Sequence, residues 1–196
     1  MKNDKPLIIL DRDGVINFDS DAYIKTVEEF IPIPGSLEAI ATLNKAGYRV
    51  VVVTNQSGIA RGYYNVETLQ SMHKKLTSLL DALGGKIEKI YYCPHGPTDG
   101  CECRKPKPGM LQQALRDMQS NAANAIMIGD SISDLAAAEA AGVSACLVST
   151  GKGERSSKQI TQQKIYSHVA VYTDLSTAVS AIVSGPSKFL KNSQVP

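Results

Sequence analysis

Short apolar runs alternate with longer amphipathic stretches along most of the chain, and this alternation limits the fold more than any other feature. The runs are continuous and mostly β-branched, which suits strands buried on both faces of a parallel sheet. They cover residues 7–10, 49–53, 89–92, 125–128 and 145–148. Helical patterns occupy the intervals, at residues 36–46, 66–83, 109–119 and 133–141. This order predicts an α/β fold with a doubly wound, mainly parallel sheet.

The end of the chain carries weaker signals. Residues 169–172 and 176–183 predict an edge strand and a closing helix. Residues 185–196 mix Gly, Pro, Ser and Lys, which predicts a flexible tail. The 196 residues suit one domain with a substantial core. We therefore expect a single domain over residues 1–184.

Polar residues follow four of the apolar runs directly. In a doubly wound sheet, ligands bind in the crevice beyond the carboxyl ends of the strands. The polar clusters are Asp11-Arg12-Asp13-Gly14, Thr54-Asn55-Gln56-Ser57, Cys93-Pro94-His95 and Gly129-Asp130-Ser131. Because parallel strands share one carboxyl edge, we expect these clusters to converge on that edge of the sheet.

Two of these clusters carry acids. Asp11 and Asp13 follow a buried strand, and strand alternation sends both carboxylates toward one side. Adjacent carboxylates repel each other unless a cation or a shared proton relieves them. Asp130 can supply a further oxygen ligand, and an all-oxygen set suits Mg²⁺. An isolated Asp-x-Asp more often caps a turn, so this motif gains its weight from the other clusters.

A basic patch stands ahead of the third helical pattern, at residues 104–109. Its prolines are expected to hold the chain extended up to a helix that begins near Gly109 or Met110. A short run of cations is usually a solvated face, but on a stiff loop Arg104 and Lys105 are expected to bind an anion. The hydroxyl and amides of residues 54–56 suit hydrogen bonds to a phosphoryl oxygen.

Three cysteines and a histidine crowd into eleven positions, at Cys93, His95, Cys101 and Cys103. In a reducing compartment such crowding favours metal binding over disulfides. Three thiolates and one imidazole form a common structural Zn²⁺ site, with no position left open for catalysis. We expect zinc to fold the loop 96–100 and thereby to position the basic patch. The alternative is a set of unpaired thiols beside a surface histidine.

Composition argues against other classes of partner. The formal charge of +2, from 21 basic and 19 acidic residues, offers no strong field to nucleic acid or to a membrane surface. A zinc-stabilised nucleic-acid-binding module would present a basic, aromatic-rich face, whereas this chain has no Trp and three Phe. The first apolar run is too short for a signal peptide, and no run reaches the about 20 residues of a membrane span. We expect a cytoplasmic protein.

The ordered motifs resemble those of the haloacid dehalogenase-like phosphatases. The matching segments are residues 11–15 (Asp-Arg-Asp-Gly-Val), 54–58 (Thr-Asn-Gln-Ser-Gly), 105–106 (Lys-Pro) and 129–134 (Gly-Asp-Ser-Ile-Ser-Asp). The resemblance implies a Rossmann-like core and one catalytic magnesium. No insertion after Asp13 or before Lys105 is long enough for a large cap domain.

The resemblance also implies a role for each matching residue. Asp11 would attack phosphorus and form an aspartyl phosphate, while Asp13 would act as general acid and base. Mg²⁺ would be held by Asp11, by the Asp13 backbone carbonyl and by Asp130. Thr54 and Lys105 would hold phosphoryl oxygens. A further residue, Asp134, would orient either a metal-bound water or Lys105.

A narrower resemblance links residues 54–62 and 103–110 to the D-glycero-D-manno-heptose 1,7-bisphosphate 7-phosphatases, which supply the heptose of lipopolysaccharide. It implies a small sugar bisphosphate substrate, a monomer, and a pocket framed by the zinc loop and residues 19–23. The expected substrate-binding residues are Asp11, Arg12, Asp13, Asp19, Tyr23, Thr54, Asn55, Gln56, Ser57, Arg61, Arg104, Lys105 and Ser131. The short loop between His95 and Cys101 also resembles the histidinol-phosphate phosphatases, so histidinol phosphate or another small sugar phosphate is the alternative substrate.

Overall fold

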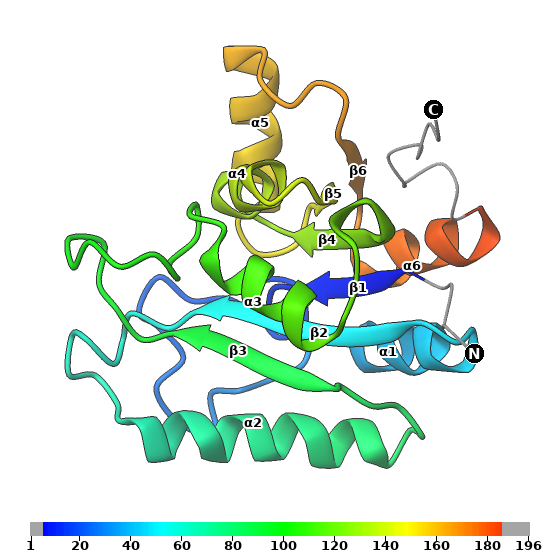
Figure 1. Ribbon diagram of the computed structural model, residues 1–196. Coiled ribbons are helices and arrows are strands. Elements are labelled where there is room, and N and C mark those ends of the chain that lie inside the picture. The colour runs from blue at the N-terminus through cyan, green and yellow to red at the C-terminus, as the bar shows by residue number, and fades with distance from the viewer. Residues whose placement is uncertain (1–5, 186–196) are drawn as a thin grey trace.

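One parallel sheet organises the molecule. The structure, a computed structural model, describes residues 6–185. The strands are β1 (Leu7–Leu10), β2 (Arg49–Asn55), β3 (Lys89–Cys93), β4 (Ala125–Gly129), β5 (Ser144–Val148) and β6 (Ala170–Tyr172). They pair in the order β3-β2-β1-β4-β5-β6, and every pair is parallel. The predicted doubly wound fold is therefore confirmed, with β1 at its centre (Figure 1).

Helices cover both faces of the sheet (Figure 1). They are α1 (Ser36–Lys45), α2 (Val66–Asp81), α3 (Gly109–Asp117), the 3-10 turn η1 (Ala122–Asn124), α4 (Ile132–Ala140), α5 (Gly153–Gln163) and α6 (Leu175–Ser184). Alternate strand residues face opposite sides, so Ile8 packs in a core with α1, α2 and α6, while Ile9 packs in a second core with α3 and α4. This two-sided burial explains why the strands read as continuous apolar runs.

The local structure differs from the prediction in two places. Helix α5 was not expected, because its sequence is polar and buries only Gly153, Ser156 and Ile160. The basic patch is turned rather than extended, since the Lys107 N–H donates to the Arg104 carbonyl oxygen at 2.9 Å. Pro108, directly before α3, already has helical backbone angles.

No cap domain interrupts the described residues, since the segments after β1 and after β3 hold only turns and two isolated bridges. Most of the predicted tail, residues 186–196, lies outside the part of the chain that the structure describes. None of the helices in residues 6–185 is long and apolar enough to span a membrane.

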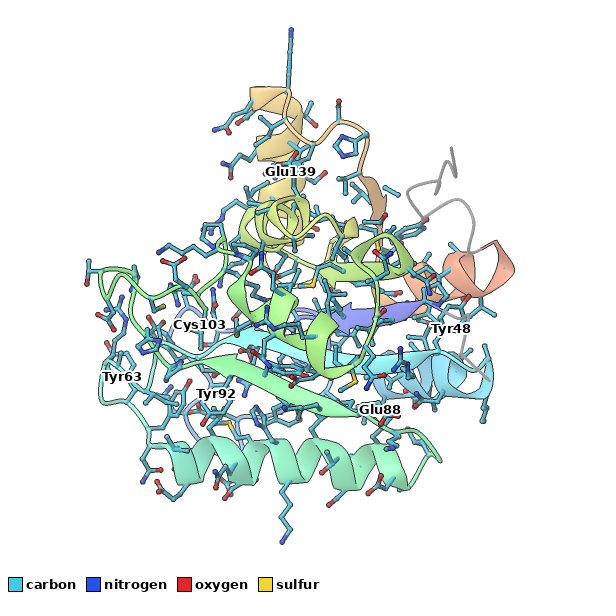
Figure 2. The ribbon with its side chains drawn as sticks, viewed as in Figure 1. Tyr48, Tyr63, Glu88, Tyr92, Cys103 and Glu139 are labelled. Carbon is cyan, nitrogen blue, oxygen red and sulfur yellow. The ribbon has the colours of Figure 1, made fainter. Side chains whose placement is uncertain are left out.

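The predicted polar clusters do gather at one edge. The strand arrows of Figure 1 end on the side where Figure 2 places Tyr63 and Cys103, and Tyr48 and Glu88 lie toward the other side. Tyr48 and Glu88 immediately precede β2 and β3, and Cys103 follows β3. The carboxyl edge of the sheet is therefore the place to look for a site.

Candidate active site

A cavity of about 450 Å³ opens at the carboxyl edge. Its lining comes from the loops after β1, β2, β4 and β5 and from the basic patch. The predicted site residues that line it are Asp11, Asp13, Asp19, Tyr23, Thr54, Asn55, Gln56, Ser57, Arg104, Lys105, Asp130 and Ser131. Segments far apart in the sequence thus form one pocket, as the strand-end rule predicted.

Asp11 lies directly after β1, where its N–H continues the sheet by donating to the Ile128 carbonyl oxygen at 3.0 Å. Its Oδ1 accepts the Arg12 N–H at 2.7 Å and lies 2.9 Å from the Lys105 ammonium. Burial raises the pKa of Asp11 from 3.8 to about 7, against the opposing effect of Lys105. The charged form of this carboxylate therefore depends on nearby cations.

Lys105 is fixed from both ends. Its ammonium is buried, donates to the Val53 carbonyl oxygen at 2.8 Å and pairs with Asp134 at 2.6 Å as well as with Asp11. Burial alone would lower its pKa, but the Asp11 and Asp134 carboxylates outweigh burial and raise it. The Asn55 amide accepts the Lys105 N–H at 3.1 Å and donates to its carbonyl oxygen at 3.0 Å. Asn55 thus holds the backbone that carries the cation.

Asp11, Asp130 and Asp134 form a carboxylate cluster, in which one oxygen of each lies within 4.8 Å of the others. Burial, then the Asp11 and Asp134 charges, raise the pKa of Asp130 from 3.8 to about 8. Lys105 pairs with two of the three acids, and the ion pairs described for residues 6–185 leave Asp130 without a cation. A hard divalent cation with oxygen ligands fits this uncompensated negative charge.

The loops around Asp130 approach one another closely. The Lys152 N–H donates to Asp130 Oδ2 at 2.7 Å, and the backbone of Gly14 turns with φ +84° beside the same carboxylate. A Cβ atom at position 14 would clash with Asp130 Oδ2. Only glycine both adopts this backbone conformation readily and leaves the carboxylate its space.

Asp134 lies in the first turn of α4, four residues after Asp130, and contacts protein groups. It caps the start of α4 by accepting the Ser131 N–H and hydroxyl at 3.1 and 2.6 Å, while it pairs with Lys105. Of the two roles considered for Asp134, orienting Lys105 is the one that these contacts support.

Hydrogen-bond donors of the protein hold the Asp13 carboxylate. Its carboxylate accepts bonds from Arg12 at 2.8 Å, from Asn17 at 2.8 Å and from Gln56 at 2.8 Å. Burial tends to raise the pKa of Asp13, but Arg12 and these hydrogen bonds outweigh burial and lower it. The Asp13 carboxylate still lines the cavity, with 21% of its side chain exposed.

Two predicted substrate-binding residues do not reach the cavity lining. Arg12 is fully buried, with its guanidinium on Asp13 and Gln56 and its plane near the Phe30 ring. The Arg12 side chain is thus turned away from the cavity and holds Asp13, and substrate binding by Arg12 stays a prediction. Arg61 is exposed and lies over the ring of Tyr23, which lines the cavity, but Arg61 is not itself a lining residue.

Lys152 and Arg155 line the cavity but were not predicted. Lys152 pairs with Asp19 at 3.0 Å and so links the loop after β5 to the loop after β1. Both cations follow the fifth apolar run. The strand-end rule, applied to this run as to the other four, would have found them. Ser133 and Gln159 also line the cavity.

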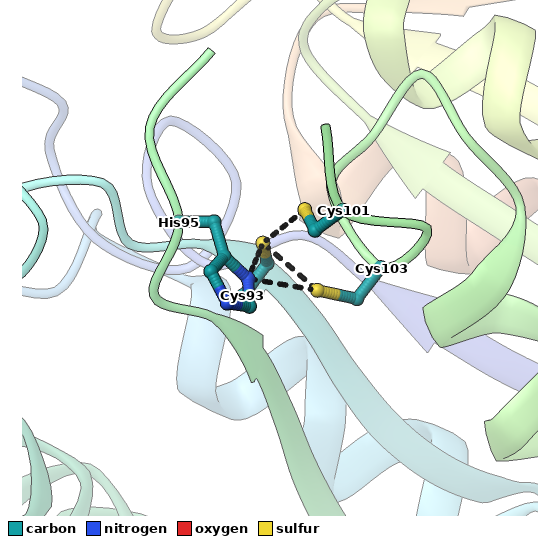
Figure 3. A group of neighbouring side chains, drawn as sticks. All are labelled: Cys93, His95, Cys101 and Cys103. Atoms are coloured by element: carbon teal, nitrogen blue, oxygen red, sulfur yellow. Dashed lines mark hydrogen bonds between the residues drawn. The ribbon is translucent and has the colours of Figure 1, made fainter. Parts of the chain in front are cut away.

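The Cys/His cluster lies where β3 ends, with Cys93, His95, Cys101 and Cys103 directed toward a common centre (Figure 3). The Cys93 sulfur lies 3.6 Å from that of Cys101 and 3.1 Å from that of Cys103, while His95 Nδ1 lies 3.3 Å from the Cys103 sulfur. A disulfide would need about 2.05 Å. A tetrahedral zinc with Zn–S bonds of about 2.3 Å separates its sulfur ligands by about 3.8 Å, so the cluster fits zinc with modest expansion.

Arg104 connects this cluster with the cavity. Its Nη1 donates to the His95 carbonyl oxygen at 3.3 Å, and its side chain lines the cavity. The position of this cation therefore depends on how the segment through His95 is folded.

The sequence matches known proteins over this same set of elements. Residues 102–178 match the model of the HAD-hydrolase-like family. A D-glycero-β-D-manno-heptose-1,7-bisphosphate 7-phosphatase of Pseudomonas putida is 60% identical over 149 residues, which are 76% of this chain and 85% of that protein. The chain belongs to this phosphatase family.

Two further heptose bisphosphate phosphatases agree over nearly their whole length. The enzyme of Pseudomonas aeruginosa is 51% identical over 91% of this chain and 98% of its own. A crystal structure of the D,D-heptose 1,7-bisphosphate phosphatase of B. bronchiseptica, complexed with magnesium and phosphate, superposes with a TM-score of 0.87 at 44% identity. It covers 91% of this chain and 98% of that one.

Proposed function

We propose that this chain removes the C7 phosphate of D-glycero-D-manno-heptose 1,7-bisphosphate, in the supply of the heptose for lipopolysaccharide. The observation that carries the proposal is the joining of Asp11, Lys105 and Asp13 in one cavity of a chain so similar to heptose bisphosphate phosphatases. Asp11 is the nucleophile. The described contacts on its carboxylate fall on Oδ1, which leaves Oδ2 available to phosphorus.

The reaction proceeds in two displacements. In the first, Asp13 takes up a proton from the solvent as the substrate binds. An Asp11 oxygen then bonds to phosphorus, the bond from phosphorus to the C7 oxygen breaks, and Asp13 gives that proton to the leaving oxygen. In the second, water attacks the phosphorus of the aspartyl phosphate, Asp13 accepts the proton from the water, and Asp11 is released with inorganic phosphate. The heptose keeps its anomeric phosphate.

Two metal ions serve different purposes in this proposal. Asp11, the Asp13 backbone carbonyl and Asp130 would hold Mg²⁺, which supplies positive charge between the carboxylate and the phosphate. Cys93, His95, Cys101 and Cys103 would hold a structural Zn²⁺.

Other residues address the two ends of the substrate. Thr54 and Lys105 hold the transferred phosphoryl group, with Lys105 already fixed through Asn55. Arg104 holds the distal phosphate, because a guanidinium can make paired bonds to phosphate or to vicinal hydroxyls. We further propose a monomer that acts in the cytoplasm as a single domain over residues 1–184.

A comparison of substrates tests the proposal. Initial rates with magnesium are measured on the heptose bisphosphate anomers, histidinol phosphate and simple sugar phosphates. The heptose bisphosphate is expected to have the highest kcat/KM. A higher value for histidinol phosphate would assign the chain to the alternative substrate, and hydrolysis of none of these esters would refute the phosphatase itself.

A further inference from the structure

A closed network of side chains at the wall of the cavity holds Asp13. Gln56 is the centre of this network and is buried. Its Nε2 donates to Asp13 Oδ2 and to Thr54 Oγ1, both at 2.8 Å. Its Oε1 accepts from the Tyr64 hydroxyl at 2.6 Å and from Arg12 Nη2 at 3.2 Å. All four hydrogen-bonding positions of the amide are therefore filled by protein groups.

The charges around Gln56 permit only one orientation of its amide. Arg12 can only donate, so the amide oxygen must face its guanidinium, and the amide nitrogen then faces the Asp13 oxygen. Tyr64 consequently donates to the amide oxygen. Burial raises the pKa of Tyr64 to about 12, which keeps the proton on this hydroxyl.

The local sequence makes room for this arrangement. A Cβ atom at position 58 would run into the ring of Tyr64, so Gly58 is what allows the ring to lie against the loop after β2. The Tyr64 hydroxyl belongs to a ring that is nearly buried, and its only described hydrogen bond is to Gln56. Within residues 54–58, the Gln56 amide is therefore held entirely by protein groups.

We infer that Gln56 and Tyr64 are positioning residues, which act in series to set the Asp13 carboxyl for proton transfer to the leaving group. Tyr64 fixes the Gln56 amide, and Gln56 fixes one Asp13 oxygen, while Arg12 and Asn17 fix the other. This inference rests on the proposed phosphatase reaction, with Asp13 as its general acid, but not on the identity of the sugar.

A series of aryl phosphates tests the inference, because general acid catalysis matters most when the leaving group is poor. The magnesium-loaded wild type and Tyr64→Phe are compared on phenyl phosphate, 4-nitrophenyl phosphate and 2,4-dinitrophenyl phosphate. The variant loses one hydroxyl, so kcat/KM should fall about three- to tenfold on phenyl phosphate and less than about twofold on the dinitrophenyl ester. The value of kcat/KM reports formation of the aspartyl phosphate and excludes its later hydrolysis.

Controls separate positioning from general damage. Tyr91→Phe removes a comparable hydroxyl, which donates to Asp117 at 2.9 Å away from the cavity, and should leave all three rates unchanged. Gln56→Met should steepen the dependence on the leaving group further. The double variant should lose no more than Gln56→Met alone, since Tyr64 acts through Gln56.

The outcomes distinguish the positioning role of Gln56 and Tyr64 from a role in binding the phosphoryl group. Equal losses along the aryl series would place the effect on the phosphoryl group, through Thr54, and would overturn the inference. Losses that multiply in the double variant would overturn the serial arrangement, and if Gln56→Met does not fold, the Tyr64→Phe series still decides. A wild type that hydrolyses no phosphate ester would instead refute the proposed function.

Discussion

The carboxylate cluster and the Cys/His cluster are both groups of metal-ligating side chains at the same edge of the sheet, yet their surroundings differ. Asp11 and Asp130 line the cavity, and burial raises the pKa of Asp11 to about 7 and that of Asp130 to about 8. No member of the Cys/His cluster is among the lining residues of that cavity, and its four ligands are enough for a complete tetrahedral site.

The difference shows what separates a catalytic metal site from a structural one. A cluster that faces a cavity with unbalanced charge can take up both a cation and an anionic substrate. A cluster that closes on itself can only hold the chain in place. Arg104 couples the two clusters, because its guanidinium donates to the His95 carbonyl oxygen and its side chain lines the cavity.

Among the tests of the carboxylate cluster, Asp11→Asn is expected to have the largest effect. The change removes the nucleophilic charge with little change in volume, so kcat should fall by about 10⁴-fold or more while the fold remains. Phosphate release and thermal melting measure the two effects. Rates equal to wild type, from a sample free of contaminating phosphatase, would exclude the covalent mechanism.

Asp13→Asn should have the next largest effect. Loss of a general acid typically costs about 10²–10⁴-fold, and the loss should shrink for aryl phosphates with good leaving groups. The same aryl series measures it. A uniform loss across the series would show that Asp13 serves binding and not proton transfer.

Arg104→Ala tests the link between the two clusters at the substrate. We expect kcat/KM to fall about ten- to a hundredfold on heptose bisphosphate and much less on heptose 7-phosphate, since binding at a distal group is used to position the reacting one. Arg61→Ala is the matched control, because Arg61 does not line the cavity, and it should change either rate little. Equal losses on both substrates would assign Arg104 to the transferred phosphoryl group.

Cys101→Ser tests the structural side. Zinc should be lost, the melting temperature should fall by about 5–10 °C, and kcat should drop only a few-fold through the displacement of Arg104. Metal analysis and melting are compared with Cys146→Ala, which removes a buried core sulfur and should lower stability without loss of zinc. The zinc site would be refuted if metal analysis found no zinc in wild-type protein that was purified under reducing conditions without chelator.

The raised pKa values of Asp11 and Asp130 give the smallest effect, on stability. In metal-free protein these groups bind protons more tightly folded than unfolded, so between about pH 4 and 8 their contribution makes stability rise as pH falls. Mg²⁺ needs the ionised carboxylates, so the rise in melting temperature on adding it should be a few degrees at about pH 8.5 and smaller at about pH 6. Equal shifts at both pH values would argue against ligation by this cluster.

The fold and most of the cavity could be predicted because both follow from strand burial. The runs around Ile9 and Val51 had to be apolar on both faces, and whatever followed each run had to reach the carboxyl edge. The sequence did not predict helix α5, because the helix packs through Ile160 and two small residues, which are too few to give a helical pattern. For the same reason the sequence did not predict Lys152 and Arg155, which lie on the loop after β5 and in the first turn of α5.

The direction of individual side chains could not be predicted. Arg12 turns inward because Asp13 and Gln56 offer it acceptors, and Gln56 lies next to it only after β1 and β2 have paired. The same holds for Asn55, whose amide pairs with the Lys105 backbone fifty positions away. Sequence motifs identified which residues gather at the site, and tertiary contacts decided which of their side chains line the cavity.

Phosphorus NMR of the reaction on heptose 1,7-bisphosphate tests the central claim most directly, because the two phosphates have distinct environments. The account predicts that the C7 phosphate signal disappears as inorganic phosphate grows, while the anomeric phosphate signal persists in the product, and that Asp11→Asn leaves both signals unchanged. Loss of the anomeric phosphate with retention of the C7 phosphate would contradict it, since the substrate would then lie in the cavity the other way round.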